Sequence, residues 1–316
     1  MIAIREAVRK GRQTVMELRH LRYFLAVADE GHVTRAASKL GIAQPPLTQQ
    51  IHQLEEQIGV SLFVRGPRGV SLSAEGRAFL PHAQAALREA ERATVAAQRV
   101  SRGEAGTLRV GFTSAASLNP LVPATINNFR TAYPGVELLL TVDATAPLLA
   151  QLSNDTLDLA FVRPTAAERE SLQCVDLPDE RLWIAVPATH PLASRKRLRL
   201  AELRAEAFVL YPRSNGSVLY DTIIATCQGA GFSPKIVQEA PQLASMVGLV
   251  AAGIGVTLVP ESVCQLRPEG VRYVRVLGQA PVATLSLVSQ RGGLFSPSIN
   301  NFLTRTQRFL ANVDTH

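Results

Sequence analysis

Cysteine is scarce in this chain of 316 residues, and Cys174, Cys227 and Cys264 lie far apart in the sequence. None belongs to a CxxC pair, so the sequence supports neither a zinc site nor a disulfide framework. We expect three buried, inert thiols, with a redox-sensing pair as the alternative. The pattern predicts no metal.

Long apolar runs are also missing. The longest, Val136–Val142 and residues 246–252, are far shorter than the roughly 18 residues that a membrane-spanning helix needs. Residues 1–15 carry four basic side chains and lack the apolar core of a signal peptide. We therefore expect a cytoplasmic protein with no membrane partner.

The sequence contains no GxSxG, Walker A or HExxH motif. Two glycine pairs, beginning at Gly229 and Gly253, lack the third glycine of a dinucleotide fingerprint, since Pro234 and Leu258 occupy that position. We therefore predict no catalytic residue, no cofactor and no enzymatic activity.

Positive charge is present in excess, with a net charge of +7. Residues 1–106 hold 15 basic and 10 acidic side chains, a net charge of +5, whereas the other 210 residues hold 18 and 16, a net charge of +2. A cationic region favours a polyanionic partner, because each neutralised phosphate releases counterions. Charge alone leaves DNA, RNA and an acidic membrane open.

Three helices are predicted in the basic third. Leu21, Phe24, Leu25 and Ala28 form the apolar stripe of a helix over Leu18–Glu30, and Thr34 is expected to cap a short helix over residues 35–40. A third helix begins near Gln44, with Pro45 and Pro46 in its first turn. Its expected buried stripe is Leu47, Ile51, Leu54 and Ile58, and its opposite face carries Thr48, Gln49 and His52.

This order is typical of a helix-turn-helix, whose second helix enters the major groove. Gln49 is suited to adenine, and Thr48 to a phosphate or a thymine methyl. Two short strands, residues 61–64 and 70–72, then predict a hairpin wing. In this wing Arg65 would contact phosphate and Arg68 would enter a narrow minor groove. The alternative is a solvated surface hairpin.

A long helix is predicted next, from residue 74. Small and apolar residues recur in steps of four and three, which is the seam of a coiled coil, and about 28 residues give a rod of roughly 40 Å. We expect dimerisation here, the alternative being a helix that lies on its own domain. The seam consists of Phe79, Ala83, Ala86, Ala90, Ala93, Ala97 and Val100.

The remaining two-thirds alternate between strand and helix patterns. They predict two α/β lobes with parallel sheets, crossing segments near residues 178–181 and 279–281, and a ligand cleft at the carboxyl ends of the strands. Arg163 is expected to pair with a ligand carboxylate, beside hydroxyls and helix N-termini that favour an anion. The alternative is that these residues only cap helices. The predicted set is Thr113, Ser114, Ser117, Thr145, Arg163, Ser214, Asn215 and Gly216.

The N-terminal third resembles the LysR-type transcriptional regulators. The resemblance is carried by residues 16–24, 34–37 and 44–51, by Leu54-Glu55, Leu62-Phe63 and Arg65, and by residues 74–76. It implies a winged helix-turn-helix, a dimerising linker helix, a two-lobed effector domain similar to periplasmic binding proteins, homotetramers, and activation of nearby genes. It also implies that Met16 is the natural start, with residues 1–15 an extension outside the fold, a tag or the result of a misassigned start. The residues that the resemblance implies and those predicted above from the helices and the hairpin together form the predicted DNA-binding set. This set is Thr34, Arg35, Gln44, Pro45, Pro46, Thr48, Gln49, His52, Arg65 and Arg68.

Two residues depart from the family pattern: Gln49 stands where many relatives have arginine, and His32 replaces a common serine. Resemblance to the branch that controls degradation of aromatic compounds implies a small aromatic or dicarboxylic acid as effector. We expect a DNA-binding domain over 16–73, a linker helix over 74–103 and an effector domain over 104–316. Within the effector domain, lobe I spans about 107–178 and 282–316, and lobe II about 179–281.

The predicted function is sequence-specific regulation of transcription, as an activator that responds to a carboxylate or aromatic effector. Its predicted partners are double-stranded promoter DNA, the effector, further copies of the chain, and RNA polymerase. The alternative is an architectural or nucleoid DNA-binding protein with no functional ligand site. A solute-binding protein is excluded, because export is incompatible with a DNA-binding region.

Overall fold

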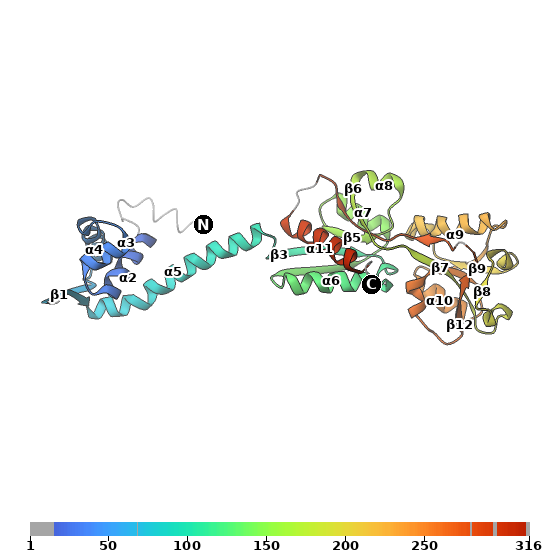
Figure 1. Cartoon of the computed structure of the whole chain (residues 1–316), viewed down its shortest axis with the longest axis horizontal. Coiled ribbons are helices and arrows are strands. Elements are labelled where there is room, and N and C mark those ends of the chain that lie inside the picture. The colour runs from blue at the N-terminus through green and yellow to red at the C-terminus, as the bar shows by residue number, and fades with distance from the viewer. Residues whose placement is uncertain (1–15, 68, 279, 293–295, 314–316) are drawn as a thin grey trace. The chain divides into compact units, whose positions relative to one another are not determined.

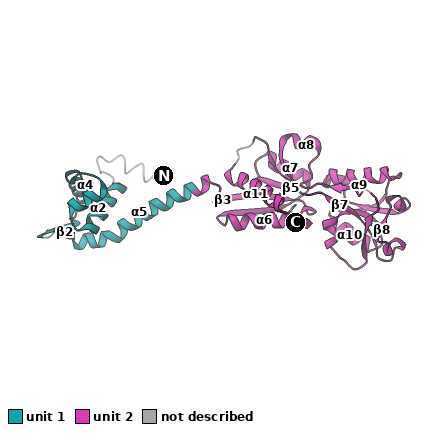
Figure 2. Ribbon diagram, viewed as in Figure 1, with its two compact units in different colours: residues 1–98 teal, residues 99–316 magenta. Residues whose placement is uncertain are grey.

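The computed structural model describes residues 16–67, 69–278, 280–292 and 296–313, so the predicted extension, residues 1–15, and Arg68 lie outside the described residues. The chain divides into two compact units, residues 1–98 and 99–316 (Figure 2). Within these described ranges, no helix is long and apolar enough to cross a bilayer. The predicted domain boundaries remain predictions.

Three helices open the first unit: α2 (Leu18–Glu30), α3 (Val33–Leu40) and α4 (Gln44–Ile58) (Figure 1). Gly31 and Gly41 end the first two, with the positive φ values of 59° and 67° that favour glycine after a helix. The prediction that Thr34 caps the second helix is wrong. That helix begins at Val33, with His32 at the N-cap, so Thr34 lies inside the first turn.

The stripe of α4 is shorter than predicted. Leu47, Ile51 and Leu54 are buried against α2 and α3, whereas Ile58 is 36% exposed. Gly59 ends α4 immediately after Ile58, in a left-handed conformation, so the last apolar position lies at the edge of the core.

A hairpin and a long helix complete this unit. The hairpin consists of β1 (Phe63–Gly66) and β2 (Gly69–Leu72), and α5 (Ala74–Ser101) follows it. The Phe24 ring of α2 packs against Phe63 and Phe79, with centroid distances of 5.3 and 5.0 Å, so one aromatic cluster joins helix, hairpin and α5. The backbone of α5 at buried Gly76 also lies very close to the backbone of Leu62, since a Cβ on Gly76 would lie 2.0 Å from the carbonyl oxygen of Leu62.

Lobe I of the second unit is one five-stranded sheet in the order β4-β3-β5-β14-β6. β3 pairs in parallel with β4 and β5, as the alternating strand and helix pattern predicts, and β14 is antiparallel to β5 and β6. The chain returns from lobe II when it forms β14, which reverses the direction of that strand. The strands are β3 (Gly106–Phe112), β4 (Val136–Val142), β5 (Leu159–Val162), β6 (Leu172–Asp176) and β14 (Ser286–Gln290).

Helices cover both faces of this sheet. Phe129 of α6 and Phe302 of α11 pack on one face, and Leu148 and Leu152 of α7 pack on the other. The second unit therefore shows the layered arrangement that the alternating pattern predicts. The helices are α6 (Leu121–Ala132), α7 (Thr145–Ser153), α8 (Ala166–Ser171) and α11 (Pro297–Val313), with the 3-10 turn η1 (Ala116–Leu118) before α6.

Lobe II has a mixed sheet. β7 is antiparallel to both β11 and β12, while β9 and β10 are parallel and join β11 through a bridge between Phe208 and Val256. Its helices are α9 (Ser217–Gly229) and α10 (Leu243–Ala251). Its strands are β7 (Glu180–Pro187), β8 (Arg197–Leu198), β9 (Ala207–Leu210), β10 (Lys235–Glu239), β11 (Thr257–Pro260), β12 (Val271–Val276) and β13 (Val282–Ala283). Four 3-10 turns complete it: η2 (Pro191–Ser194), η3 (Leu200–Leu203), η4 (Arg213–Asn215) and η5 (Glu261–Gln265).

The crossing between lobes explains one further error. The sequence predicts a single strand over residues 282–288, but the structure has β13 paired with the start of β7, and then β14 inside the lobe I sheet. No glycine or proline in Val282–Val288 marks the division, although the two short strands belong to different sheets.

Glu55 connects α4 to the hairpin, and its removal should destabilise the first unit. Its carboxylate accepts the backbone N–H groups of Leu62 (2.7 Å) and Phe63 (3.1 Å) and is 15% exposed. Glu55→Ala leaves two partly buried donors unpaired, which should cost about 2 kcal/mol and speed amide exchange at Leu62 and Phe63. Thermal unfolding and hydrogen exchange of the full chain measure this. The exposed neighbour provides the control, Glu56→Ala, and equal effects of the two variants would contradict the assignment.

Candidate functional site

A polar surface covers the N-terminal half of α4. Gln44, Pro45, Pro46 and Gln49 are exposed, and Leu47 on the opposite side is buried. The Oγ1 of Thr34 in α3 donates to the Oε1 of Gln44 at 3.0 Å, so the two helices of the helix-turn-helix are linked at the start of α4. Thr48 donates its hydroxyl to the carbonyl of Gln44 at 3.1 Å, which leaves its oxygen able to accept.

Three side chains predicted to contact DNA, two arginines and one histidine, differ in their surroundings. Arg35 is held by the end of α2, because its guanidinium donates to the carbonyl of Glu30 and lies 3.7 Å from that residue's carboxylate. His52 has its Nδ1 3.6 Å from Glu55, with 60% of the side chain exposed. Arg65 is exposed on β1 and has no ion pair within the part of the chain that the structure describes. Of the three, Arg65 has the fewest internal partners.

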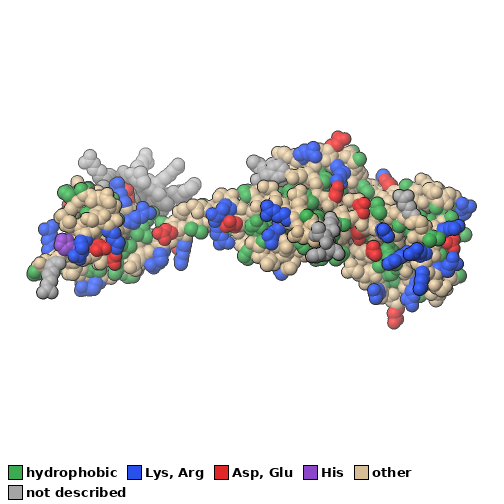
Figure 3. Space-filling model, in the orientation of Figure 1, with side chains coloured by type: hydrophobic (Ala, Val, Ile, Leu, Met, Phe, Trp, Pro, Cys, Tyr) green, Lys and Arg blue, Asp and Glu red, His purple; other side chains and the backbone are tan. Residues whose placement is uncertain are grey.

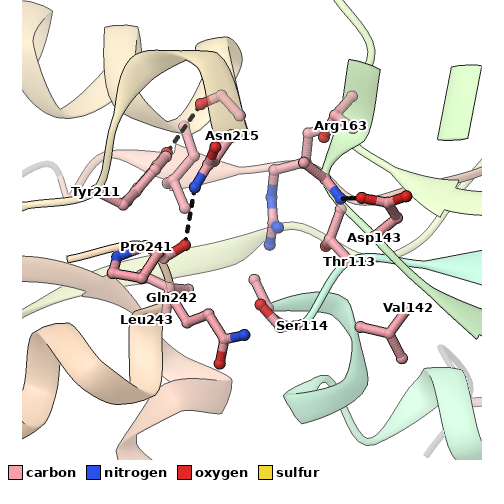
Figure 4. A pocket seen from close by; sticks show the side chains of 15 residues that line it. Thr113, Ser114, Val142, Asp143, Arg163, Tyr211, Asn215, Pro241, Gln242 and Leu243 are labelled. Atoms are coloured by element: carbon pink, nitrogen blue, oxygen red, sulfur yellow. Dashed lines mark hydrogen bonds between the residues drawn. The ribbon is translucent and has the colours of Figure 1, made fainter. Parts of the chain in front are cut away.

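The second candidate site is a cavity of about 370 Å³ between lobe I and lobe II (Figure 4). The carboxyl ends of β3, β4 and β5 contribute the lobe I wall, and residues around the starts of α9 and α10 contribute the other. The lining residues are Thr113, Ser114, Ala115, Val142, Asp143, Ala144, Thr145, Arg163, Tyr211, Asn215, Gly216, Leu219, Pro241, Gln242 and Leu243.

Three helices begin at this cavity. Thr145 is the first residue of α7, Gly216 is the N-cap of α9, and Gln242 is the N-cap of α10. None of the three N-caps makes a side-chain capping hydrogen bond. Helix N-termini carry partial positive charge and unpaired N–H groups, so all three favour an anion at this position.

Among the described residues that line the cavity, only Arg163 carries a full positive charge. It is 7% exposed, and its guanidinium points into the cavity in Figure 4. Its Nη2 lies 3.1 Å from Glu180, and its Nε is buried with no hydrogen-bond partner among the described residues. Burial lowers the pKa of Arg163, and the Glu180 charge offsets part of that effect. The predicted carboxylate partner of Arg163 therefore has an internal competitor.

Glu180 connects the two lobes through this pair. It begins β7, and while one carboxylate oxygen binds Arg163 of lobe I, the other accepts the backbone N–H of Ser262 in lobe II at 3.0 Å. Both side chains of the ion pair are at most 10% exposed. A ligand that binds Arg163 more strongly than Glu180 does would thus break a contact that joins the two lobes.

Six of the eight residues predicted for this pocket line it, and two do not. Ser117 instead donates its hydroxyl to the carbonyl of Ser114 at 2.7 Å, and Ser214 lies 3.5 Å from the amide oxygen of Asn215. The six that line the cavity are Thr113, Ser114, Thr145, Arg163, Asn215 and Gly216.

Sequence reasoning missed Tyr211 and Gln242, although both follow from rules already in use. Tyr211 comes directly after β9, at the carboxyl end of a strand, and its hydroxyl donates to the carbonyl of Gly216 at 3.0 Å. Burial raises the pKa of Tyr211, so it stays a neutral donor. Gln242 is the N-cap of α10, the position directly before the first helical residue, Leu243.

None of the three cysteines lines this cavity, and of the thiols predicted to be buried only Cys227 is, whereas Cys174 and Cys264 are partly exposed. All are free thiols, and burial raises the pKa of Cys227 to about 11 and that of Cys264 to about 12, with the charge of Glu261 adding to the second. Burial also raises the pKa of Cys174. Thiols that stay protonated are poor nucleophiles, which favours the inert interpretation. The described residues hold no group of three or more candidate metal ligands.

Comparison with known proteins adds the family. Residues 18–77 match the bacterial regulatory helix-turn-helix protein, lysR family, and residues 101–311 match the LysR substrate binding domain. The chain is 40% identical over 287 residues to the uncharacterized HTH-type transcriptional regulator YnfL of Escherichia coli, which covers 91% of this chain and 96% of YnfL. It is 37% identical over 288 residues to AlsR of Bacillus subtilis, covering 91% and 94%.

The solved structures agree with the fold. The LysR family regulator CbnR in complex with its target DNA superposes with a TM-score of 0.79 at 29% identity, covering 93% of this chain and all of that one. The predicted fold class and the predicted lack of enzymatic function are confirmed by these matches. The chain therefore belongs to the LysR family of DNA-binding transcriptional regulators with an effector-binding domain.

Proposed function

We propose that this chain is a cytoplasmic transcriptional activator that responds to a small aromatic or dicarboxylic acid bound between its two lobes. The observation that carries the proposal is the convergence on one cavity of three helix N-termini and the buried guanidinium of Arg163. A volume of about 370 Å³ lies within the usual range of small-molecule sites. A functional ligand site distinguishes this proposal from an architectural DNA-binding protein.

The effector's carboxylate would be held by Arg163 and by the helix N-termini. Ser114 adds a hydroxyl whose oxygen makes no hydrogen bond within the described residues, and Gln242 adds an amide that points toward the cavity in Figure 4. Val142, Leu219 and Leu243 supply an apolar wall for the carbon skeleton. This mixture fits a small acid with an aromatic or aliphatic body better than a sugar, which needs polar partners all round.

Binding would change the angle between the lobes through Glu180. An effector carboxylate competes with Glu180 for Arg163, and Glu180 in turn holds the backbone of Ser262. A ligand shifts a conformational equilibrium only by binding one state more tightly, and this competition gives it different contacts in the two states. The change would alter how the assembled regulator holds promoter DNA and contacts RNA polymerase.

On DNA, we propose that α4 reads the major groove through Gln49 and Thr48 while the hairpin contacts phosphates through Arg65. Gln44, Pro45, Pro46 and His52 would position the start of α4, with Thr34 and Arg35 on the phosphate side. The proposed partner is a second copy of the chain, and two dimers would form a tetramer. Support comes from α5, where Ala86, Ala93, Ala97 and Val100 of the predicted seam are exposed in the single chain.

Ser114 and Ser117 form a matched pair for testing the effector site. We expect at least one small aromatic or dicarboxylic acid to raise the melting temperature, because a ligand of the native state stabilises it. Ser114→Ala should weaken that acid about tenfold, since it removes one hydrogen bond to a charged group. Ser117→Ala should leave the affinity unchanged. Thermal shift and calorimetry measure both, and equal effects, or no response to any acid at millimolar concentration, would refute the proposed site.

Arg65 tests the proposed contact between the hairpin and phosphate. Arg65→Ala should weaken promoter binding and lower the slope of log K against log salt by about one, because one phosphate is no longer neutralised. Fluorescence anisotropy across a range of salt concentrations gives that slope. Arg195→Ala removes the same charge from an exposed site in the other unit and serves as the control. A slope that Arg65→Ala leaves unaltered would remove the hairpin from the DNA interface.

A further inference from the structure

A second hollow lies on lobe II, formed by β7, β8, β12 and β13 together with the start of η5. Its volume is about 500 Å³, and it shares no lining residue with the cavity between the lobes. Its polar lining consists of Arg181, Arg197, Arg275 and Glu261, and Trp183 supplies its aromatic ring. Basic side chains also gather over the lobe II end of the face drawn in Figure 3.

The pairing of the strands sets these side chains in a row. Arg275 on β12 lies opposite Trp183 on β7 and opposite Arg197 on β8. Arg181 lies two residues before Trp183 on the same strand and therefore on the same face. The guanidinium of Arg275 lies 4.9 Å from the centroid of the Trp183 ring, which places it on that face as well.

This row has little internal counter-charge. Like charges directly opposite each other on neighbouring strands are destabilising, yet Arg275 and Arg197 occupy such positions. Neither of them, nor Arg181, forms an ion pair within the described part of the chain. Other partly exposed arginines of this unit are paired at close range, as Arg109 is with Asp158 at 2.7 Å and Arg213 with Asp221 at 2.6 Å.

We propose that this hollow binds a small organic phosphate that carries at least two negative charges. Guanidinium groups offer several N–H donors in a planar fork, and three of them from different strands can surround the oxygens of a phosphate from several directions. The half-buried Trp183 ring offers an apolar surface to the carbon skeleton, and Glu261 can accept from a hydroxyl. The concave shape and volume fit a small molecule rather than a duplex backbone.

Trp183 is the single tryptophan of the chain, so its fluorescence reports on this hollow directly. The experiment titrates the full chain with pyrophosphate at constant ionic strength and follows tryptophan emission, with calorimetry as a second readout. We expect a saturable change, because an anion on Arg275 alters the contact between its guanidinium and the indole. Citrate is also a multivalent anion, but its carboxylate groups are planar and do not offer the tetrahedral arrangement of oxygens around phosphorus. It should therefore bind more weakly than pyrophosphate.

Variants assign the binding to these residues. Arg275→Gln and Arg197→Gln should each weaken pyrophosphate at least tenfold, and Arg197→Gln leaves the pair between Arg275 and Trp183 in place. Arg272→Gln is the matched control, because Arg272 is exposed on the same strand but, three residues away, points to the opposite face. Ser114→Ala, in the cavity between the lobes, should leave pyrophosphate affinity unchanged.

Several results would overturn the proposal. One is the absence of a saturable fluorescence change up to about 10 mM pyrophosphate. Another is a loss of pyrophosphate affinity in Arg272→Gln equal to that in Arg275→Gln. A third is a loss of pyrophosphate affinity in Ser114→Ala, which would place the anion in the other cavity. Tighter binding of citrate would contradict the choice of phosphate. Tighter binding of a random duplex, lost in Arg197→Gln, would assign the hollow to nucleic acid instead.

Discussion

A buried guanidinium at the junction of two lobes is the constraint on which the ligand-binding half of this molecule depends. Arg163 is nearly inaccessible, and a charge in that position is costly unless a carboxylate and hydrogen bonds compensate it. Glu180 compensates it from the first residue of the strand that crosses into lobe II. The same ion pair therefore joins the two lobes and involves the positive charge on the cavity wall.

The DNA-binding half depends on a different kind of contact, namely hydrogen bonds to polar groups at the ends of its helices and of its hairpin. Thr34 joins α3 to the start of α4, and Glu55 joins the end of α4 to the hairpin. These contacts fix the polar surface of α4 relative to Arg65, while the aromatic cluster around Phe24 carries the unit's packing. On the proposed DNA interface, this positioning would let the side chains of α4 distinguish one base sequence from another, because phosphate contacts alone carry no sequence information.

Much of this arrangement could be predicted from the sequence, for identifiable reasons. The stripe of Leu47, Ile51 and Leu54 repeats at helical spacing, and glycines at residues 31, 41 and 59 mark helix ends, so the helix-turn-helix was found with small boundary errors. The pocket residues on lobe I were found because carboxyl ends of parallel strands meet at one edge of a sheet. That rule uses only the order of strands.

The features that could not be predicted from the sequence depend on pairing between distant segments, which local patterns do not encode. The antiparallel direction of β14 depends on the chain's return from lobe II, and no glycine or proline in residues 282–288 marks the split between β13 and β14. The partner of Arg163 could not be predicted either. Glu180 follows it by 17 residues, in a segment that the sequence marked only as a crossing.

The measurement that tests the account most directly is a linkage titration with a confirmed effector. Promoter affinity is measured with and without saturating effector, and effector affinity is measured with and without saturating promoter DNA. If the lobes transmit binding to the DNA-binding unit, both ratios must differ from one and must equal each other, because coupling free energy is reciprocal. Ratios of one in both directions would show that the cavity does not regulate DNA binding, and would contradict the account.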